Sequence, residues 1–190
     1  LSAELNYQVY DLKNWQYFLI TDGVCNNLNV QLSLGRSTVD HPYFPRQGSE
    51  FSLVASATPP YSAWDGKDYA NLAKNVNSPT YKDELRDKHK WIEYYKIKFR
   101  SKTYTSLTPG KYNLVLMTRA DFGILGSYNK NKKSPFETFY VGGDGMSGYT
   151  IYGVDIIGLR GYEDGALDPM DGNYSIAYNK YTMELRYPII

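Results

Sequence analysis

The chain has 190 residues with 21 Lys and Arg against 20 Asp and Glu, so it lacks the basic surplus typical of a nucleic-acid-binding protein. Its 42% hydrophobic content excludes a disordered chain, and no stretch approaches the roughly 20 consecutive apolar residues of a membrane-spanning helix. Twenty tyrosines and a mean hydropathy of -0.51 favour a tyrosine-rich β protein.

Alternation of apolar and polar residues, the signature of strands with one apolar face, recurs in six segments. They are residues 1–10, 27–34, 51–57, 91–101, 112–122 and 181–187. The first begins at residue 1 and the last ends in an apolar Pro188-Ile189-Ile190, so we interpret the sequence as a piece of a longer polypeptide.

Two architectures have long strands with one apolar and one polar face: a β-sandwich with a wet outer side, and a transmembrane β-barrel with a polar lumen. Several segments reach the roughly 9 to 11 residues that cross a bilayer, whereas globular strands average about 5 or 6. Aromatic residues near the segment ends resemble an interfacial girdle: Tyr10, Trp15, Tyr17, Phe18 and Tyr187. We therefore predict an all-β fold, a transmembrane antiparallel β-barrel.

The barrel interpretation assigns each strand face to lipid or to the lumen. We expect apolar residues toward lipid: Leu28, Leu32, Tyr95, Ile97, Phe99, Leu114, Leu116, Met183 and Leu185. We expect charged residues toward the lumen: Lys96, Lys98, Arg100, Arg119 and Glu184. Six strands cannot close a membrane barrel, because the smallest have eight, so further strands are expected beyond the two ends or in partner chains.

Connection lengths predict two sides of the barrel. Turns at 38–49 and 105–110 are expected on the periplasmic side, and the loops are expected on the opposite side: 14–23, 59–89 and 127–172. We call residues 59–89 the insertion. Its charged run, 82–90, is interpreted as one exposed helical turn or coil.

The sequence is poor in residues for metal or nucleophilic chemistry. Its single cysteine, Cys25, excludes an internal disulfide framework, and the two histidines, His41 and His89, lie far apart. Residues 143–148 fit the dinucleotide pattern G-x-G-x-x-G, but 149–153 are poor helix formers and offer no helix N-terminus for a pyrophosphate. We expect no enzyme activity, no metal and no cofactor.

Three further motifs occur in a fixed order. Residues 135–143 read PFETFYVGG, residues 157–162 read IGLRGY, and residues 184–188 read ELRYP. Together with residues 37–49 they closely resemble the C-terminal barrel of the BamA family of outer-membrane barrel-assembly factors. The resemblance covers nearly the whole chain and implies about strands seven to twelve of a sixteen-stranded barrel.

The resemblance implies site residues and partners. A loop approach would be formed by Phe139, Gly142 and Gly143, and the functional loop motif would be Leu159, Arg160, Gly161 and Tyr162. The implied activity is insertion and folding of β-barrel proteins in the bacterial outer membrane. The implied partners are unfolded outer-membrane protein substrates, accessory assembly lipoproteins and outer-membrane lipids, with no nucleic acid.

Alternatives stay open at this point. Two-partner-secretion transporters and TamA-like barrels share the signature loop, and a soluble β-sandwich binding module would show similar alternation. Within the barrel hypothesis, Arg160 is expected to reach into the lumen and pair with Glu184, since a guanidinium matches a carboxylate in two parallel bonds. From the residues alone, a solvated loop arginine fits about as well.

Overall fold

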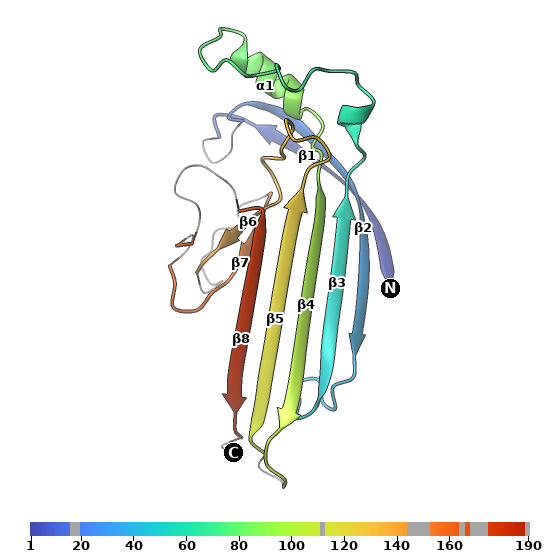
Figure 1. The fold of residues 1–190 in the computed structure, drawn as a ribbon, viewed down its shortest axis with the longest axis vertical. Coiled ribbons are helices and arrows are strands. Elements are labelled where there is room, and N and C mark those ends of the chain that lie inside the picture. The colour runs from blue at the N-terminus through green and yellow to red at the C-terminus, as the bar shows by residue number, and fades with distance from the viewer. Residues whose placement is uncertain (16–19, 111–112, 144–152, 164–165, 168–174, 189–190) are drawn as a thin grey trace.

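The structure is a computed structural model that describes residues 1–15, 20–110, 113–143, 153–163, 166–167 and 175–188. Its main element is a six-stranded antiparallel sheet in the order β1-β2-β3-β4-β5-β8 (Figure 1). The strands are β1 (Ser2–Leu12), β2 (Gly23–Ser37), β3 (Gly48–Ala57), β4 (Tyr95–Ser106), β5 (Val115–Gly126) and β8 (Ala177–Arg186). All six alternating segments overlap one of these strands, which confirms the antiparallel all-β prediction.

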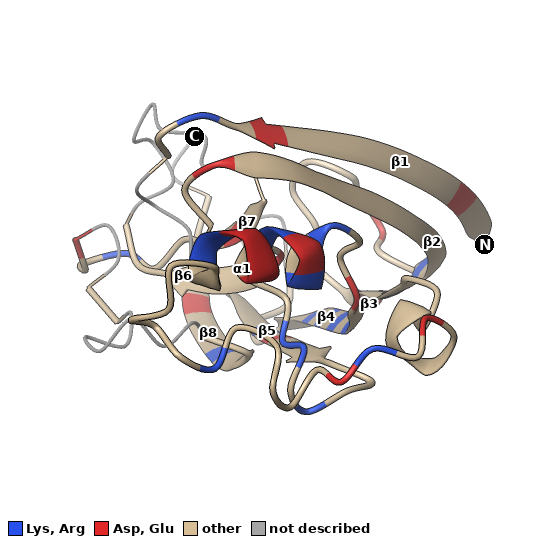
Figure 2. Ribbon diagram, turned by 90° about the horizontal axis from the view of Figure 1, so that it is seen from above, with Lys and Arg blue, Asp and Glu red and all other residues tan. Residues whose placement is uncertain are grey.

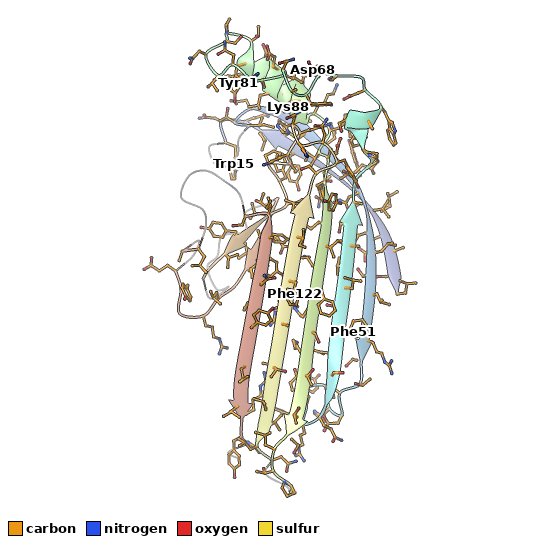
Figure 3. The ribbon with its side chains drawn as sticks, in the orientation of Figure 1. Trp15, Phe51, Asp68, Tyr81, Lys88 and Phe122 are labelled. Atoms are coloured by element: carbon orange, nitrogen blue, oxygen red, sulfur yellow. The ribbon has the colours of Figure 1, made fainter. Side chains whose placement is uncertain are left out.

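The register sorts the side chains into two faces, because residues paired across strands share a face. Lys96 pairs with Ser56 and Leu125, while its neighbour Ile97 pairs with Ala55 and Ile124. One face, here called the outer face, is mostly apolar and includes Leu28, Leu32, Phe51, Phe99, Phe122 and Met183 (Phe51 and Phe122 are labelled in Figure 3). The other, here called the inner face, carries most of the charged residues of the strands.

The sheet is curved, and further elements lie on its concave side (Figure 2). These are a nine-residue helix, α1 (Tyr81–His89), and a two-stranded parallel pair, β6 (Thr138–Val141) with β7 (Val154–Ile157). Lys96 and Lys98 contact Glu137 and Asp155 of this region, so the inner face is the concave one. The β6–β7 pair lies within the long 127–172 loop and was not expected from the sequence.

An apolar core fills the loop end of the concave side. It joins buried residues of the sheet, the insertion and the loop: Leu12, Ile20, Cys25, Leu85, Ile92, Tyr94, Leu125, Phe136 and Phe139. Tyr10 points into this core and stacks on Phe136 with ring centroids 4.6 Å apart. Tyr10 is therefore not part of an interfacial girdle, which corrects the sequence interpretation, while Tyr17 and Phe18 lie outside the described residues.

The insertion contains the 3-10 helix η1 (Tyr61–Ala63) and α1, so the charged run is more ordered than predicted. Acidic residues occupy the first turn of α1 and basic residues the last, which complements the helix dipole. Leu85 and His89, four residues apart, are both buried and form one face of the helix. The exposed residues Lys82, Asp83, Arg86 and Asp87 occupy the face toward solvent, which explains a helix inside a charged run.

The expected strand 91–101 begins only at residue 95. The preceding Ile92, Glu93 and Tyr94 are buried, and the Tyr94 backbone N–H donates to Thr58 Oγ1 at 2.8 Å. The Thr58 hydroxyl takes the place of a ladder carbonyl here, and the Ile92 N–H bonds instead to the Asn26 carbonyl of β2 at 2.9 Å, so the regular β3–β4 ladder starts only after Tyr94.

The connections fall at the two ends as the parity argument predicts. Residues 38–47 and 107–110 lie at one end of the sheet, and the insertion lies at the other (Figure 1). Among the described helices, neither is long and apolar enough to cross a membrane.

Candidate functional site

The candidate site is the contact between the inner face and the β6–β7 region of the long loop. β6 joins the start of β8 through the Phe139 N–H, which donates to the Ser175 carbonyl at 2.9 Å. The Lys180 ammonium donates to the Gly158 carbonyl just after β7. Backbone and side-chain hydrogen bonds thus fix the loop to the six-stranded sheet, here called the wall.

Lys96 is the centre of the charged contacts in this site. Its Nζ lies 3.1 Å from Glu137 Oε2 and 3.0 Å from Asp155 Oδ2, and its side chain is 5% exposed. Lys98 Nζ lies 2.7 Å from the same Asp155 oxygen. Two lysines of β4 are therefore matched by two carboxylates of the loop, which neutralises charges that would be costly to bury alone.

The protonation of Asp155 follows from this geometry. Burial opposes its ionisation, but the charges of Lys96 and Lys98 and their hydrogen bonds outweigh burial and hold the pKa of Asp155 below its usual value. Glu137 contributes its carboxylate from a backbone with φ of 68°, a conformation that is uncommon outside glycine. Its N–H donates to the Gly153 carbonyl at 2.5 Å, which helps to keep that conformation.

Aromatic packing adds to the charged contacts. The Phe139 ring meets Tyr178 of β8 edge to face at 4.8 Å, and the Lys96 ammonium lies 4.9 Å from the Phe139 centroid. The predicted approach residue Phe139 is 1% exposed, so it is a main packing contact between the loop and the wall.

The two sequence motifs of the loop are brought together by backbone bonds. The Gly143 N–H is directed at the Tyr162 carbonyl at 3.2 Å and the Glu163 carbonyl at 3.0 Å. The Gly143 carbonyl accepts from the Leu159 N–H at 2.6 Å, and the Gly142 N–H donates to Ile157 at 3.1 Å. Gly143 and Gly161 have φ of 74° and 84°, conformations that a side chain would disfavour, so this turn depends on glycine at both places.

Arg160 and Glu184 are placed differently from the sequence expectation. Arg160 is exposed, whereas the Glu184 carboxylate accepts from Arg186 of its own strand at 2.8 Å. Between Arg160 and Glu184 the described residues hold no ion pair within 4.0 Å, although Arg160 lies within electrostatic range. Arg186 shares the inner face with Glu184 two residues away, and so reaches the carboxylate without help from the loop.

The other predicted lumen residues also lie on the inner face. Arg100 Nε lies 2.8 Å and Arg119 Nε 2.6 Å from the two oxygens of Asp121, which is 2% exposed. Further from the loop, Lys102 Nζ lies 2.5 Å from Glu50 of β3. The basic residues of β4 and β5 thus all have carboxylate partners on the inner face or in the loop.

Sequence reasoning named the basic residues of β4 and β5 that lie in the site, and missed Lys180 of β8 and the acidic residues Asp121, Glu137 and Asp155. Asp121 alternates with the apolar residues of its strand, and Glu137 lies inside the PFETFYVGG motif, so both carried a usable signal. Asp155 had none, because β7 is only four residues long. No group of three His, Cys, Asp or Glu suited to a metal ion occurs in the described part of the chain.

Comparison with known proteins identifies the family. The family model described as the Omp85 superfamily domain matches residues 2–190 of the chain. The chain belongs to the Omp85 superfamily. Omp85 proteins are in general outer-membrane β-barrel proteins that act in protein insertion or translocation, in agreement with the curved sheet and its apolar outer face. No curated protein and no solved structure matches the chain.

Proposed function

We propose that this Omp85 chain forms about strands seven to twelve of a sixteen-stranded BamA-type barrel that inserts and folds β-barrel proteins in the bacterial outer membrane. The observation that carries the proposal is the inverted burial within β4. Lys96 is 5% exposed, whereas its neighbour Ile97 is 44% exposed. A soluble sandwich would reverse this order, while a barrel wall with lipid outside and a filled lumen requires it.

The wall acts by physical means and catalyses no covalent reaction in this proposal. A seam formed by other strands of the barrel presents unpaired backbone groups, and an incoming substrate strand pairs with them by main-chain hydrogen bonds. This pairing satisfies the backbone polar groups that lipid would leave unsatisfied. The six strands described above form the wall away from the seam.

The loop has a mechanical role in the proposal. Its β6–β7 region cross-links β4 through Lys96 and Lys98 and β8 through Lys180, so it resists deformation of the wall while the seam opens. The turn containing Arg160, Gly161 and Tyr162 is held against Gly143 and forms the functional tip of this loop. Substrates, accessory lipoproteins and lipids act on the barrel around this fixed part.

A reconstitution experiment tests the proposal. Full-length protein is placed in liposomes with an unfolded outer-membrane barrel substrate, and substrate folding is followed by heat-modifiable gel migration. We expect faster substrate folding with the wild type and a smaller acceleration with Lys96→Met, because that change leaves Glu137 without its lysine and Asp155 with only Lys98. Lys102→Met is the matched control, since Lys102 lies on the same face but pairs with Glu50.

Two results would contradict the proposal. Release of an unfolded passenger across the liposome membrane without faster barrel folding would identify a transporter of the two-partner-secretion or TamA type. Full solubility and cooperative unfolding without detergent would identify a soluble binding module.

A further inference from the structure

A pocket of about 280 Å³ lies between the insertion and the segments next to it, apart from the loop site. It is formed where η1, the end of α1 and residue 132 of the long loop meet at the loop end of the sheet (Figure 3 shows this end with Tyr81 and Lys88 labelled). The pocket is smaller than the roughly 300–1,000 Å³ typical of sites for drug-sized ligands, so it suits a small ligand or one ring of a larger one.

Aromatic rings form one wall of this pocket. The Tyr61 ring lies 5.0 Å from Trp91 at an angle of 34° and 6.5 Å from Trp64 at an angle of 84°. Trp64 is 70% exposed, so its ring is open to a ligand from solution. The electron-rich faces of such rings attract the polarised C–H groups that line one side of a sugar ring.

The polar lining offers both donors and acceptors. Lys67 bonds to both oxygens of Asp87 at 2.6 Å, and Asp65 accepts from the Tyr69 hydroxyl. Ammonium groups have three protons and carboxylates about four lone-pair positions, so each group keeps capacity for further bonds. Neighbouring hydroxyls of a sugar, which both donate and accept, fit such a mixed lining.

The charges of the lining argue against an ionic ligand. The three lysines are Lys67, Lys90 and Lys132; they face Asp65 and Asp87 in the pocket, and Glu93 lies against Lys132. The lining is therefore close to neutral. An aromatic cage for a cation is excluded as well, because the Lys132 ammonium already lies 4.8 Å from the Tyr69 centroid and 5.9 Å from Tyr61.

The pocket is preformed by a buried network. Glu93, 1% exposed, accepts from the Ser62 N–H at 2.7 Å and the Ser62 hydroxyl at 2.6 Å, and lies 3.5 Å from Lys132 Nζ. These bonds fix η1 and thereby the Tyr61 ring. A ligand would consequently bind without the cost of ordering the walls.

We propose that this pocket binds a neutral saccharide ring. Trp64 stacks on its C–H face, Trp91 borders the edge of the same ring, and Lys67 and Asp87 bond its hydroxyls. Such a ring is available either as the end of a free oligosaccharide or as the headgroup of a glycolipid.

The test uses full-length protein in detergent on an array of neutral mono-, di- and trisaccharides. We expect wild-type binding to at least one saccharide and a loss of about tenfold or more in Trp64→Ala, the effect of removing one stacking contact. Trp64 is exposed, so this change leaves the core intact. Tyr43→Ala is the control, because Tyr43 is 81% exposed in the turn at the opposite end of the sheet.

Each outcome bears on the proposal. Binding that is lost in Trp64→Ala, weakened in Asp87→Asn and kept in Tyr43→Ala supports it. Equal binding by the wild type and Trp64→Ala, or no wild-type binding to any saccharide on the array, overturns it. Vesicles with and without a glycolipid carrying the selected saccharide, in competition with the free saccharide, then identify which source the pocket prefers.

Discussion

The two faces of the same sheet have opposite chemistry and opposite surroundings. On the outer face, Leu32 is 51% exposed and Met183 is 73% exposed, and no part of the chain that the structure describes covers them. On the inner face, Lys96 and Asp121 are buried and paired. Hydrophobic residues are exposed where lipid is the expected solvent, and charged residues are buried where a partner charge is present. The comparison shows that burial alone does not define the interior of a membrane barrel wall.

The largest effect is expected from unbalancing the inner face. Lys96→Met leaves Glu137 without its lysine and Asp155 with only Lys98, which should reduce the free energy of unfolding by about 3–5 kcal/mol. Lys102→Met, whose partner Glu50 is half-exposed, should cost about 1 kcal/mol or less. Denaturant unfolding of full-length protein in liposomes, read by heat-modifiable migration, measures both. Equal losses would show that burial of Lys96 is unimportant.

Adding a charge to the outer face should have the next largest effect. Leu32→Lys places an ammonium group toward lipid and should cost about 2–4 kcal/mol if it lies near the bilayer midplane. Ser33→Lys, one residue along the same strand, points to the inner face and should cost clearly less. The same unfolding assay compares the two variants. A larger loss for Ser33→Lys would reverse the assignment of the faces.

The insertion gives a pH-dependent test of buried groups outside the sheet. Burial, together with the charges of Lys88 and Lys132, lowers the pKa of His89 to about 3. Below about pH 6.5 the unfolded segment binds a proton that the folded segment excludes. The free energy of unfolding therefore decreases as the pH is lowered, by about 2 kcal/mol between pH 7 and pH 5. Hydrogen exchange of residues 81–94 at both pH values measures the change.

Two variants separate His89 from other acid effects. His89→Gln should remove most of the pH dependence, whereas His41→Gln, at an exposed position in the 38–47 turn, should retain it. Equal pH dependence in the wild type and His89→Gln would assign the effect to other groups.

The smallest effect is expected where the loop tip meets the inner face. Because Arg160 is exposed and Glu184 pairs with Arg186, a double-mutant cycle of Arg160→Ala and Glu184→Gln should give a coupling below about 0.5 kcal/mol. The corresponding cycle of Arg186→Met and Glu184→Gln should give a coupling of about 0.2–1 kcal/mol. A coupling above about 1 kcal/mol between Arg160 and Glu184, together with a weaker coupling in the cycle that uses Arg160→Lys as the reference, would restore the anchor expected from the sequence.

The strands were predictable and the contacts between them and the loop were only partly so. Period-two alternation arises in a long strand whose two faces have different surroundings, and all six strands meet this condition. It fails for β6 and β7, which have four residues each, and for Tyr10, whose aromatic ring suits an interface as well as the core. The partners of Lys96 come from residues 41 and more positions away, and no local pattern specifies such a pairing.

The topology of the sheet also has a kinetic consequence. Four of its five strand pairs join neighbours in sequence across turns or the insertion, but β5 and β8 are separated by about fifty residues that contain β6 and β7. Closing a longer segment costs more chain entropy and slows contact formation. We therefore expect β4 and β5 to gain protection from hydrogen exchange before β8 during assembly. The long loop therefore delays the pairing of β8 with β5.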